Sequence, residues 1–188
     1  MAIDTGRIEA AVAELLAAIG EDPARPGLID TPRRVAESYA EFFSGVGVDA
    51  AAALTAIPAD ETGQLVISRD LAFRSVCEHH LLPFLGVAHL AYEPADRIAG
   101  LGTLATLVDT IASRPQLQER LGQEIAEAIA EGLGAKGALV VLDAVHGCVT
   151  SRGPRQAHSS TLTVAAVGTL AEPARRAEAL ALIGKGDG

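Results

Sequence analysis

The sequence has no tryptophan, only 3% aromatic residues, and fewer cations than anions, with 15 Lys and Arg against 24 Asp and Glu. So few aromatic side chains exclude the stacking platforms that hold single-stranded nucleic acid. The net charge of -9 excludes the basic surface to which a nucleic-acid backbone or an anionic membrane binds. We therefore expect neither nucleic acid nor a membrane as a partner.

Long apolar runs are missing as well, since no stretch approaches the roughly 18 to 20 consecutive apolar residues that a membrane-spanning helix needs. Residues 1–7 include Asp4 and lack a basic region followed by an apolar stretch, so they do not have the pattern of a signal peptide. The sequence predicts a cytoplasmic protein. Its only two cysteines, Cys77 and Cys148, are then expected to be reduced thiols rather than a disulfide.

The 188 residues suffice for one globular domain. Segments with apolar residues at helical spacing and segments with strand-like alternation follow one another along the chain. The predicted helices are 4–19, 31–44, 104–113, 115–133 and 171–183, and the predicted strands are 65–76, 85–92, 137–149 and 159–167. This order predicts an α+β domain with an antiparallel sheet that carries helices on one face, preceded by N-terminal helices. The exposed edges of such a sheet predict a homo-oligomer in which another subunit covers them.

Cysteine and histidine are concentrated in two short segments. Cys77 and His80 lie three positions apart, and His146 and Cys148 form the second cluster. Thiolate and imidazole suit zinc better than magnesium or calcium. Alternation along the strand 137–149 predicts that His146 and Cys148 share one face. Cys77, His80 and Cys148 would leave a fourth position open, as in a catalytic zinc site that activates water for hydrolysis.

A plainer interpretation is open for each of these residues alone, because a cysteine can be a small buried hydrophobe and a histidine an ordinary hydrogen-bonded side chain. The clusters hold both cysteines and three of the five histidines, which favours the metal hypothesis. His79 and His146 would then lie beside the metal as candidate proton carriers, since imidazole titrates nearest to neutral pH. His89 and His158 lie outside the clusters, and we assign them no role in the site.

Four segments of the chain resemble the GTP cyclohydrolase I family: TPRRVAESYAEFFSG, SVCEHHLLPFLGVAHLAYEP, RPQLQERLGQEIAEAI and DAVHGCVTSRGPR. The resemblance implies a zinc hydrolase that converts GTP into 7,8-dihydroneopterin triphosphate and formate, a step toward tetrahydrofolate. It also implies a tunnelling fold, an antiparallel ββααββ unit, assembled as a homodecamer with active sites at subunit interfaces. On this basis we expect an N-terminal helical region at 1–62, a tunnelling-fold catalytic domain at 63–170 and a C-terminal helical tail at 171–188.

The resemblance implies the same metal ligands as the two clusters do, because Cys77, His80 and Cys148 match the family's zinc ligands. His79 and His146 match the histidines that position water and carry protons while C8 of the purine is hydrated and the imidazole ring opens.

The resemblance also implies substrate-binding residues. Gln118 and Glu119 match a pair whose carboxylate binds the guanine edge, and an acceptor there suits the adjacent N–H groups of guanine. Arg34 and Arg152 match residues that bind the triphosphate, for which the planar guanidinium fork is suited. Arg155, in the same loop as Arg152, is a further phosphate candidate.

The chain departs from the family in one motif. Where the family pattern is Gly-Leu-Ser-Lys-x-x-Arg, Gly102, Thr103 and Thr106 replace the serine, the lysine and the arginine. In the family the lysine and the arginine contact the triphosphate, and the serine lies near the ribose and phosphates. A charge-assisted hydrogen bond contributes about 1.5 to 3 kcal/mol, so the loss of two predicts roughly 100-fold weaker GTP binding or more.

Three hypotheses follow from this departure. The protein is a GTP cyclohydrolase I whose phosphate site is compensated elsewhere. Alternatively, it is a divergent paralogue in specialised metabolism that acts on a less phosphorylated guanine substrate or stops at the ring-opened pyrimidine. In the third hypothesis it is an inactive zinc-binding subunit, against which the complete set of ligands and proton carriers argues.

Overall fold

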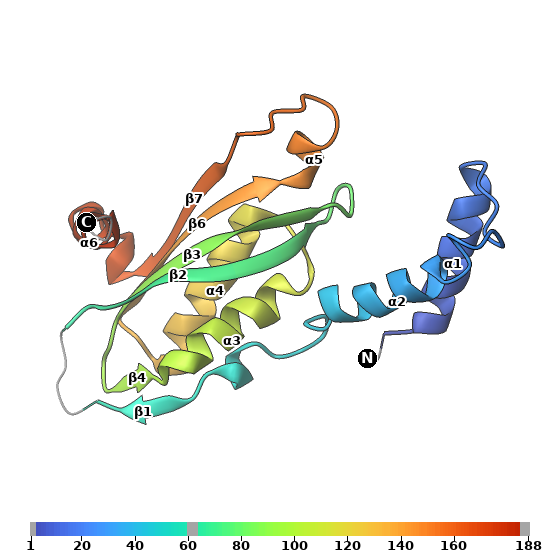
Figure 1. The fold of residues 1–188 in the computed structure, drawn as a ribbon. Helices are drawn as coiled ribbons and strands as arrows, with labels where there is room; N and C mark the ends of the chain where they lie inside the picture. Colours follow the sequence, from blue (N-terminus) through green and yellow to red (C-terminus); the bar gives the residue numbers. More distant parts are fainter. Residues whose placement is uncertain (1–2, 60–63, 185–188) are drawn as a thin grey trace.

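A five-stranded sheet forms the centre of the protein, whose structure is a computed structural model that describes residues 3–59 and 64–184 (Figure 1). The strand order is β5-β2-β3-β6-β7, and every neighbouring pair is antiparallel except β2 and β5. The strands are β2 (Val66–Cys77), β3 (Pro83–Glu93), β5 (Pro115–Gln116), β6 (Gly137–His146) and β7 (Thr161–Gly168). Between β3 and β6 the chain forms β4 (Arg97–Ala99), α3 (Leu101–Ala112) and α4 (Gln118–Leu133). The predicted α+β class and the ββααββ order are confirmed.

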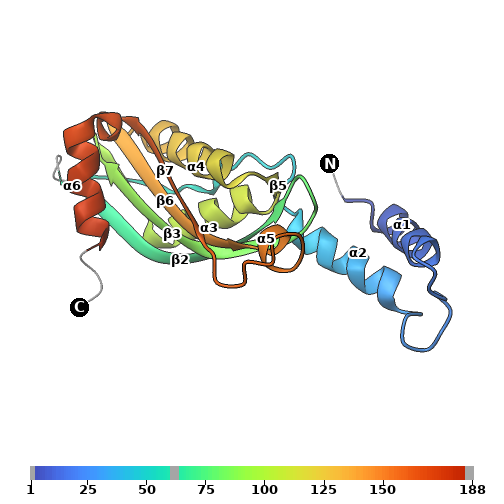
Figure 2. The ribbon, with the colours of Figure 1, turned by 90° about the horizontal axis from the view of Figure 1, so that it is seen from above.

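The main core lies between the sheet and the two helices α3 and α4, which cover one face (Figure 2). Apolar residues recur at helical spacing on both helices, and their side chains are fully buried. The largest of them are Leu104, Leu107, Ile111, Leu121, Ile125, Ile129 and Leu133. Each such side chain stabilises the fold by about 1.5 to 3 kcal/mol relative to an exposed one. The α4 helix is therefore held rigidly against β6 and β7.

The C-terminal helix α6 (Pro173–Ile183) lies on the opposite face of the sheet, across one end (Figure 2). It follows a short 3-10 helix, η2 (Thr169–Ala171), and a second, smaller core forms beneath it from Leu139, Val141, Leu170 and Ala179. The predicted helix 171–183 is thus confirmed. The prediction of helices on only one face is incomplete, because α6 covers part of the other.

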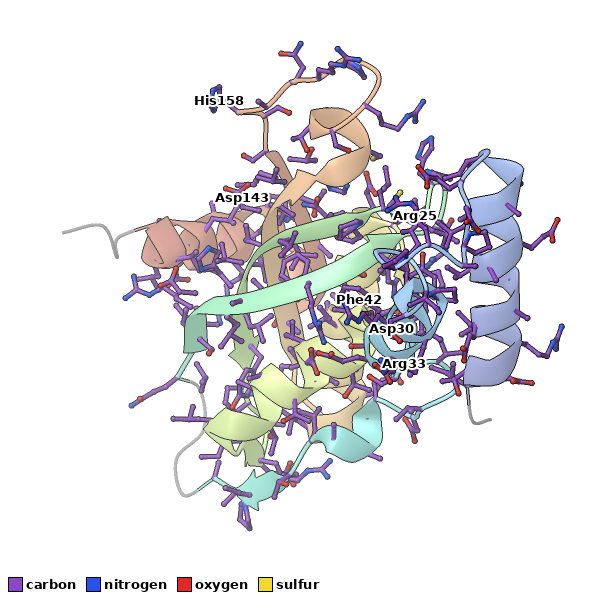
Figure 3. The ribbon with its side chains drawn as sticks, turned by 45° about the vertical axis from the view of Figure 1, so that its right-hand side comes forward. Arg25, Asp30, Arg33, Phe42, Asp143 and His158 are labelled. Atoms are coloured by element: carbon purple, nitrogen blue, oxygen red, sulfur yellow. The ribbon has the colours of Figure 1, made fainter. Side chains whose placement is uncertain are left out.

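The N-terminal helices α1 (Thr5–Ala18) and α2 (Thr31–Phe42) form a hairpin that projects away from the sheet (Figures 1 and 2). Arg25, Asp30 and Arg33 lie on this hairpin in Figure 3. Its attachment to the sheet includes a cation–π contact, with the Arg74 guanidinium 4.9 Å from the centre of the Phe42 ring. The hairpin is therefore an appendage that packs mainly on itself.

The segment after the hairpin already belongs to the body of the protein. The 3-10 helix η1 (Ala51–Ala53) packs on α3 and α4, and β1 (Ala56–Pro58) pairs with β4. The predicted domain boundary after residue 62 lies outside the described residues and stays a prediction.

Two predicted boundaries are wrong. The helix predicted from residue 115 begins at Gln118, because Pro115 and Gln116 pair with the end of β2 instead. The strand predicted through residue 149 ends at His146, and Cys148 lies on a one-turn helix, α5 (Gly147–Thr150). At Gly147 a Cβ atom would lie 2.7 Å from the Pro83 carbonyl oxygen, so the chain leaves the strand at a close approach that requires glycine.

No helix in the described part of the chain combines the length and apolarity needed to cross a membrane.

The pairing of β3 with β6 depends on Gly86. A Cβ atom at this position would lie 2.1 Å from the Asp143 carbonyl oxygen and 2.7 Å from the Ala144 Cβ atom. We expect Gly86→Ala to lower the free energy of unfolding by about 2 kcal/mol or more, because two paired strands must separate to admit the methyl group. Chemical denaturation measures this loss.

Gly6→Ala is the matched control, since the nearest atom to its added methyl group lies 3.7 Å away. Equal stability of the two variants would show that β3 and β6 adapt to the methyl group without cost.

Candidate metal centre and active site

Cys77, His80 and Cys148 meet at one end of the sheet, where the turn between β2 and β3 lies near α5 (Figure 1). One ligand atom from each residue lies within 4.8 Å of the others. Ligand atoms around one tetrahedral zinc ion lie roughly 3.5 to 4 Å apart, so small side-chain movements bring this group to coordination distance. Two thiols and an imidazole fit zinc, and a fourth position remains for a non-protein ligand.

Backbone hydrogen bonds shape the turn that carries two of these ligands. Cys77 is the last residue of β2, and its N–H donates to the Leu82 carbonyl oxygen at 2.9 Å. The Leu81 N–H in turn donates to the Cys77 carbonyl oxygen at 2.9 Å, with Leu81 in the left-handed region at φ 50°. This tight reversal places Cys77 and His80 on the same turn.

Arg120, on α4, stabilises this turn through contacts with β5, which lies beside it, and with a residue within it. Its Nε donates to the Gln116 side-chain oxygen at 3.0 Å and its terminal nitrogen donates to the Pro115 carbonyl oxygen at 3.1 Å. The same terminal nitrogen forms an ion pair with Glu78, the residue between Cys77 and His79. Sequence reasoning missed this contact, because no local pattern pairs two residues that are 42 positions apart.

The thiol of Cys148 lies in a half-buried position beside Cys77. Burial raises the pKa of Cys148, and the neighbouring Cys77 raises it further, whereas the positive charge of Arg152 lowers it. Because the pKa of Cys148 is raised, metal binding at this thiol would release a proton.

His146 ends β6 and is held on two sides. Its ring stacks on Phe84 with the ring centres 4.6 Å apart and an angle of 7° between the planes. Its Nε2 lies 2.6 Å from the side-chain oxygen of Gln118. Burial lowers the pKa of His146 and the charge of Glu119 raises it, so the dominant influence favours the neutral imidazole, which can accept a proton.

Gln118 and Glu119, predicted as a pair, lie in different surroundings. The Gln118 side chain is 2% exposed and is hydrogen-bonded within the fold. Glu119 is exposed and lines an open groove of about 350 Å³ together with Gln123, Thr163 and Ala165. The groove follows the outer edge of β7, so it offers a carboxylate beside an edge strand of the sheet.

The remaining predicted residues divide into near and distant ones. His79 is exposed, with its ring centre 6.3 Å from that of His80. Arg152 and Arg155 lie on the exposed loop 151–160, Arg152 close enough to influence Cys148. Arg34 lies in the first turn of α2, at the end of the hairpin away from the sheet, where it pairs with Asp30 at 3.6 Å (Figure 1). The structure therefore does not bring Arg34 to the ligand group of its own chain.

Gly102, Thr103 and Thr106 lie in the first turns of α3, next to β4 and at the opposite end of the sheet from the ligand group (Figure 1). Thr103 donates its hydroxyl to the Gly100 carbonyl oxygen at 2.6 Å, and Thr106 donates to the Gly102 carbonyl oxygen at 3.2 Å. Both hydroxyls thus bind their own helix and carry no charge.

The two histidines outside the clusters are placed away from this chemistry. His89 is half-buried on β3 and its Nδ1 accepts a hydrogen bond from the Asp70 N–H at 3.2 Å. His158 lies on the exposed loop before β7 (Figure 3).

We expect Arg120→Leu to weaken zinc binding by about 10-fold, because the ion pair of Arg120 with Glu78 holds the turn that carries Cys77 and His80, and contacts that orient ligands contribute about that much to metal affinity. Competition with a chromogenic chelator measures the affinity without any assay of activity. Arg97→Leu is the control, since Arg97 is an exposed arginine whose partner is its neighbour Asp96 at 3.6 Å. Unchanged zinc affinity in Arg120→Leu would show that the turn holds its shape without this ion pair.

Comparison with known proteins identifies one family model and several similar proteins. The family model described as GTP cyclohydrolase I matches residues 8–184. A GTP cyclohydrolase 1 of Leifsonia xyli subsp. xyli is 60% identical over 185 residues, which is 97% of each protein. A GTP cyclohydrolase 1 of Rhodopirellula baltica is 47% identical over 184 residues, covering 97% of this chain and 80% of that protein. Among solved structures, the apo form of an archaeosine synthase QueF-Like protein matches 57% of this chain and 97% of that one, with 17% identity and a TM-score of 0.48. The family model and these relatives show that the chain belongs to the GTP cyclohydrolase I family.

Proposed function

We propose that the protein is a zinc-dependent GTP cyclohydrolase that hydrolyses the guanine imidazole ring at C8 and releases formate, converting GTP and water into 7,8-dihydroneopterin triphosphate. Family membership supports a cyclohydrolase. The observation that carries the finer proposal is the convergence of Cys77, His80 and Cys148, with His146 two residues from Cys148 and Glu119 near enough to His146 to raise its pKa. Zinc held by these three residues would act as a Lewis acid and lower the pKa of water toward about 7.

His79 and His146, the two histidines of the clusters that are not proposed as ligands, supply proton transfer. His146 is half-buried and inclined to the neutral state, so it can take a proton during attack on C8 and return it when the ring nitrogen leaves. His79 is exposed next to His80 and can exchange protons with solvent. A half-buried imidazole at His146 and an exposed one at His79 suit a reaction in which protons move within the site and also enter it from solvent.

Glu119 supplies guanine recognition. A carboxylate offers two acceptor oxygens, and guanine presents N1–H and its exocyclic amino group side by side as donors. In the groove beside β7 the carboxylate is exposed, so it is open to a base that enters along the sheet edge. Adenine lacks this donor pair, so the contact favours guanine.

The predicted phosphate-binding residues support an oligomer with shared sites. Arg152 lies near the ligand group, but Arg34 and the α3 motif lie at distant points of the same chain (Figure 1). A substrate that contacts all of them must therefore lie between copies of the chain. The outer edge of β7, where Leu162 is 62% exposed, is an open strand at which another copy can pair, in keeping with a homodecamer.

The α3 motif favours a second candidate function. Thr103 and Thr106 offer no positive charge where the family has a lysine and an arginine, and both hydroxyls are engaged with their own helix. A guanine substrate with fewer phosphates would lose little from this change. The second candidate is therefore ring opening of a less phosphorylated guanine compound, with or without closure to a pterin.

Product analysis by mass spectrometry tests both functions. The zinc-loaded protein is incubated with GTP, GDP, GMP, guanosine and guanine, and formate and pterin are scored separately, with Cys148→Ala as the metal-site control. We expect formate and dihydroneopterin triphosphate from GTP, and neither from Cys148→Ala. Turnover of only the less phosphorylated compounds would establish the second candidate, and no turnover of any would mark an inactive zinc-binding subunit.

Replacing Thr103 and Thr106 by the family's lysine and arginine measures how much GTP affinity the α3 motif has lost. We expect Thr103→Lys with Thr106→Arg to lower KM for GTP by roughly 100-fold and to leave KM for guanosine unchanged, since each charge-assisted contact contributes about 1.5 to 3 kcal/mol. Steady-state kinetics with both substrates check this. An equal KM for GTP before and after the change would show that other cations already fill the phosphate site.

A further inference from the structure

We propose that Gln118 is a positioning residue that acts through His146, rather than a residue that binds substrate. Its side-chain oxygen lies 2.6 Å from the His146 Nε2 and accepts a hydrogen bond from that nitrogen, which fixes the orientation and the tautomer of the ring. The hydrogen bond to Gln118 determines the orientation of the His146 ring whatever the reaction is, and the catalytic consequence rests on the function proposed above.

The orientation of the Gln118 amide follows from what surrounds its nitrogen. Nε2 lies 3.0 Å from the Leu142 carbonyl oxygen, 2.8 Å from the Thr161 carbonyl oxygen and 3.1 Å from the Thr163 hydroxyl oxygen. Backbone carbonyl oxygens can only accept hydrogen bonds, so the amide group that faces them must be the NH₂ donor. The reversed orientation would place the Gln118 amide oxygen against the carbonyl oxygens of Leu142 and Thr161, none of which can donate.

The protonation of the histidine ring follows in turn. An amide oxygen can only accept, so the His146 Nε2 at 2.6 Å must carry a hydrogen. A neutral imidazole has one N–H group, which leaves Nδ1 with its lone pair. Within residues 3–59 and 64–184, no hydrogen bond occupies Nδ1. The stacking on Phe84 fixes the plane of the ring, so a ring flip would lose the contact with Gln118.

The burial of the Gln118 side chain favours a positioning role over direct substrate binding. The Gln118 side chain is 2% exposed, and both of its polar groups are already engaged within the chain. Glu119, the next residue, is exposed in the groove. A substrate could bind Gln118 only after breaking hydrogen bonds that join α4 to β6 and β7, and a buried polar group left without its partner is costly.

Nitrogen-15 NMR of histidine-labelled protein tests the tautomer directly. Comparison with His146→Ala assigns the His146 ring signals among the five histidines. In the wild-type protein we expect a protonated Nε2 and an unprotonated Nδ1, and in Gln118→Met a mixture of the two tautomers. A protonated Nδ1 in the wild-type protein would overturn the proposal, whether or not the protein turns over any guanine compound.

A double-mutant cycle with His146 tests the catalytic consequence. We expect Gln118→Met to lower kcat by about 10-fold or more at unchanged KM, because it removes the orientation of a proton carrier but no substrate contact. In the His146→Ala background the same substitution should cause no further loss. Gln64→Met, at an exposed residue ahead of β2, is the matched control and should keep both constants.

The alternatives give different patterns. A rise in KM, or an undiminished loss in the His146→Ala background, would assign Gln118 to substrate binding and contradict the proposal. Thermal unfolding of each variant accompanies the kinetics, and the wild-type tautomer decides the question even if Gln118→Met does not fold. Absence of wild-type turnover with every guanine compound would refute the proposed function and leave the tautomer result standing.

Discussion

The antiparallel pairing of β3 with β6 determines where the chemistry of this protein lies. Its register sets Phe84 opposite His146, so the stacked rings mark the end of the ladder. The turn that carries Cys77 and His80 comes just before the start of β3, and Cys148, on α5, comes two residues after the end of β6. A slip of one residue would turn the side chains of β6 to the other face and separate the ligands. The close approach of the two backbones at Gly86 is part of the same constraint.

Much of this arrangement follows from local sequence patterns. The helical and strand-like periods predict the long elements of the body (β2, β3, α3, α4, β6, β7 and α6) but not the short ones (β1, β4, β5, α5, η1 and η2). The concentration of thiols and imidazoles predicts the group Cys77, His80 and Cys148, whose ligand atoms the structure brings within 4.8 Å of one another. These predictions succeed because periodicity and ligand chemistry are properties of short segments. The role of the group as a zinc site remains part of the proposed function.

The features that the sequence does not predict all depend on contacts between distant segments. The sequence predicts that a helix begins at Pro115, but this residue pairs with β2 and belongs to a short strand. Cys148 continues the alternation of a strand, but the approach of Pro83 at Gly147 ends that strand two residues earlier. Gln118 is expected to bind substrate together with Glu119, but the packing of α4 on β6 and β7 buries its side chain. In each case tertiary contact outweighs the local pattern.

The first turn of α4 links the parts of the site. In a helix successive side chains point about 100° apart, so three consecutive residues face three different directions. Gln118 points to His146, Glu119 faces the groove along β7, and Arg120 holds Glu78 in the ligand turn. The buried residues Leu121 and Ile125 fix this turn against the sheet. One rigid helix end therefore sets the distances between the proposed proton carrier, the guanine-binding carboxylate and the metal ligands. A shift of α4 would therefore disturb His146, the Glu119 carboxylate and the ligand turn together. The step of about 100° between successive side chains is what gives these neighbouring residues such different surroundings.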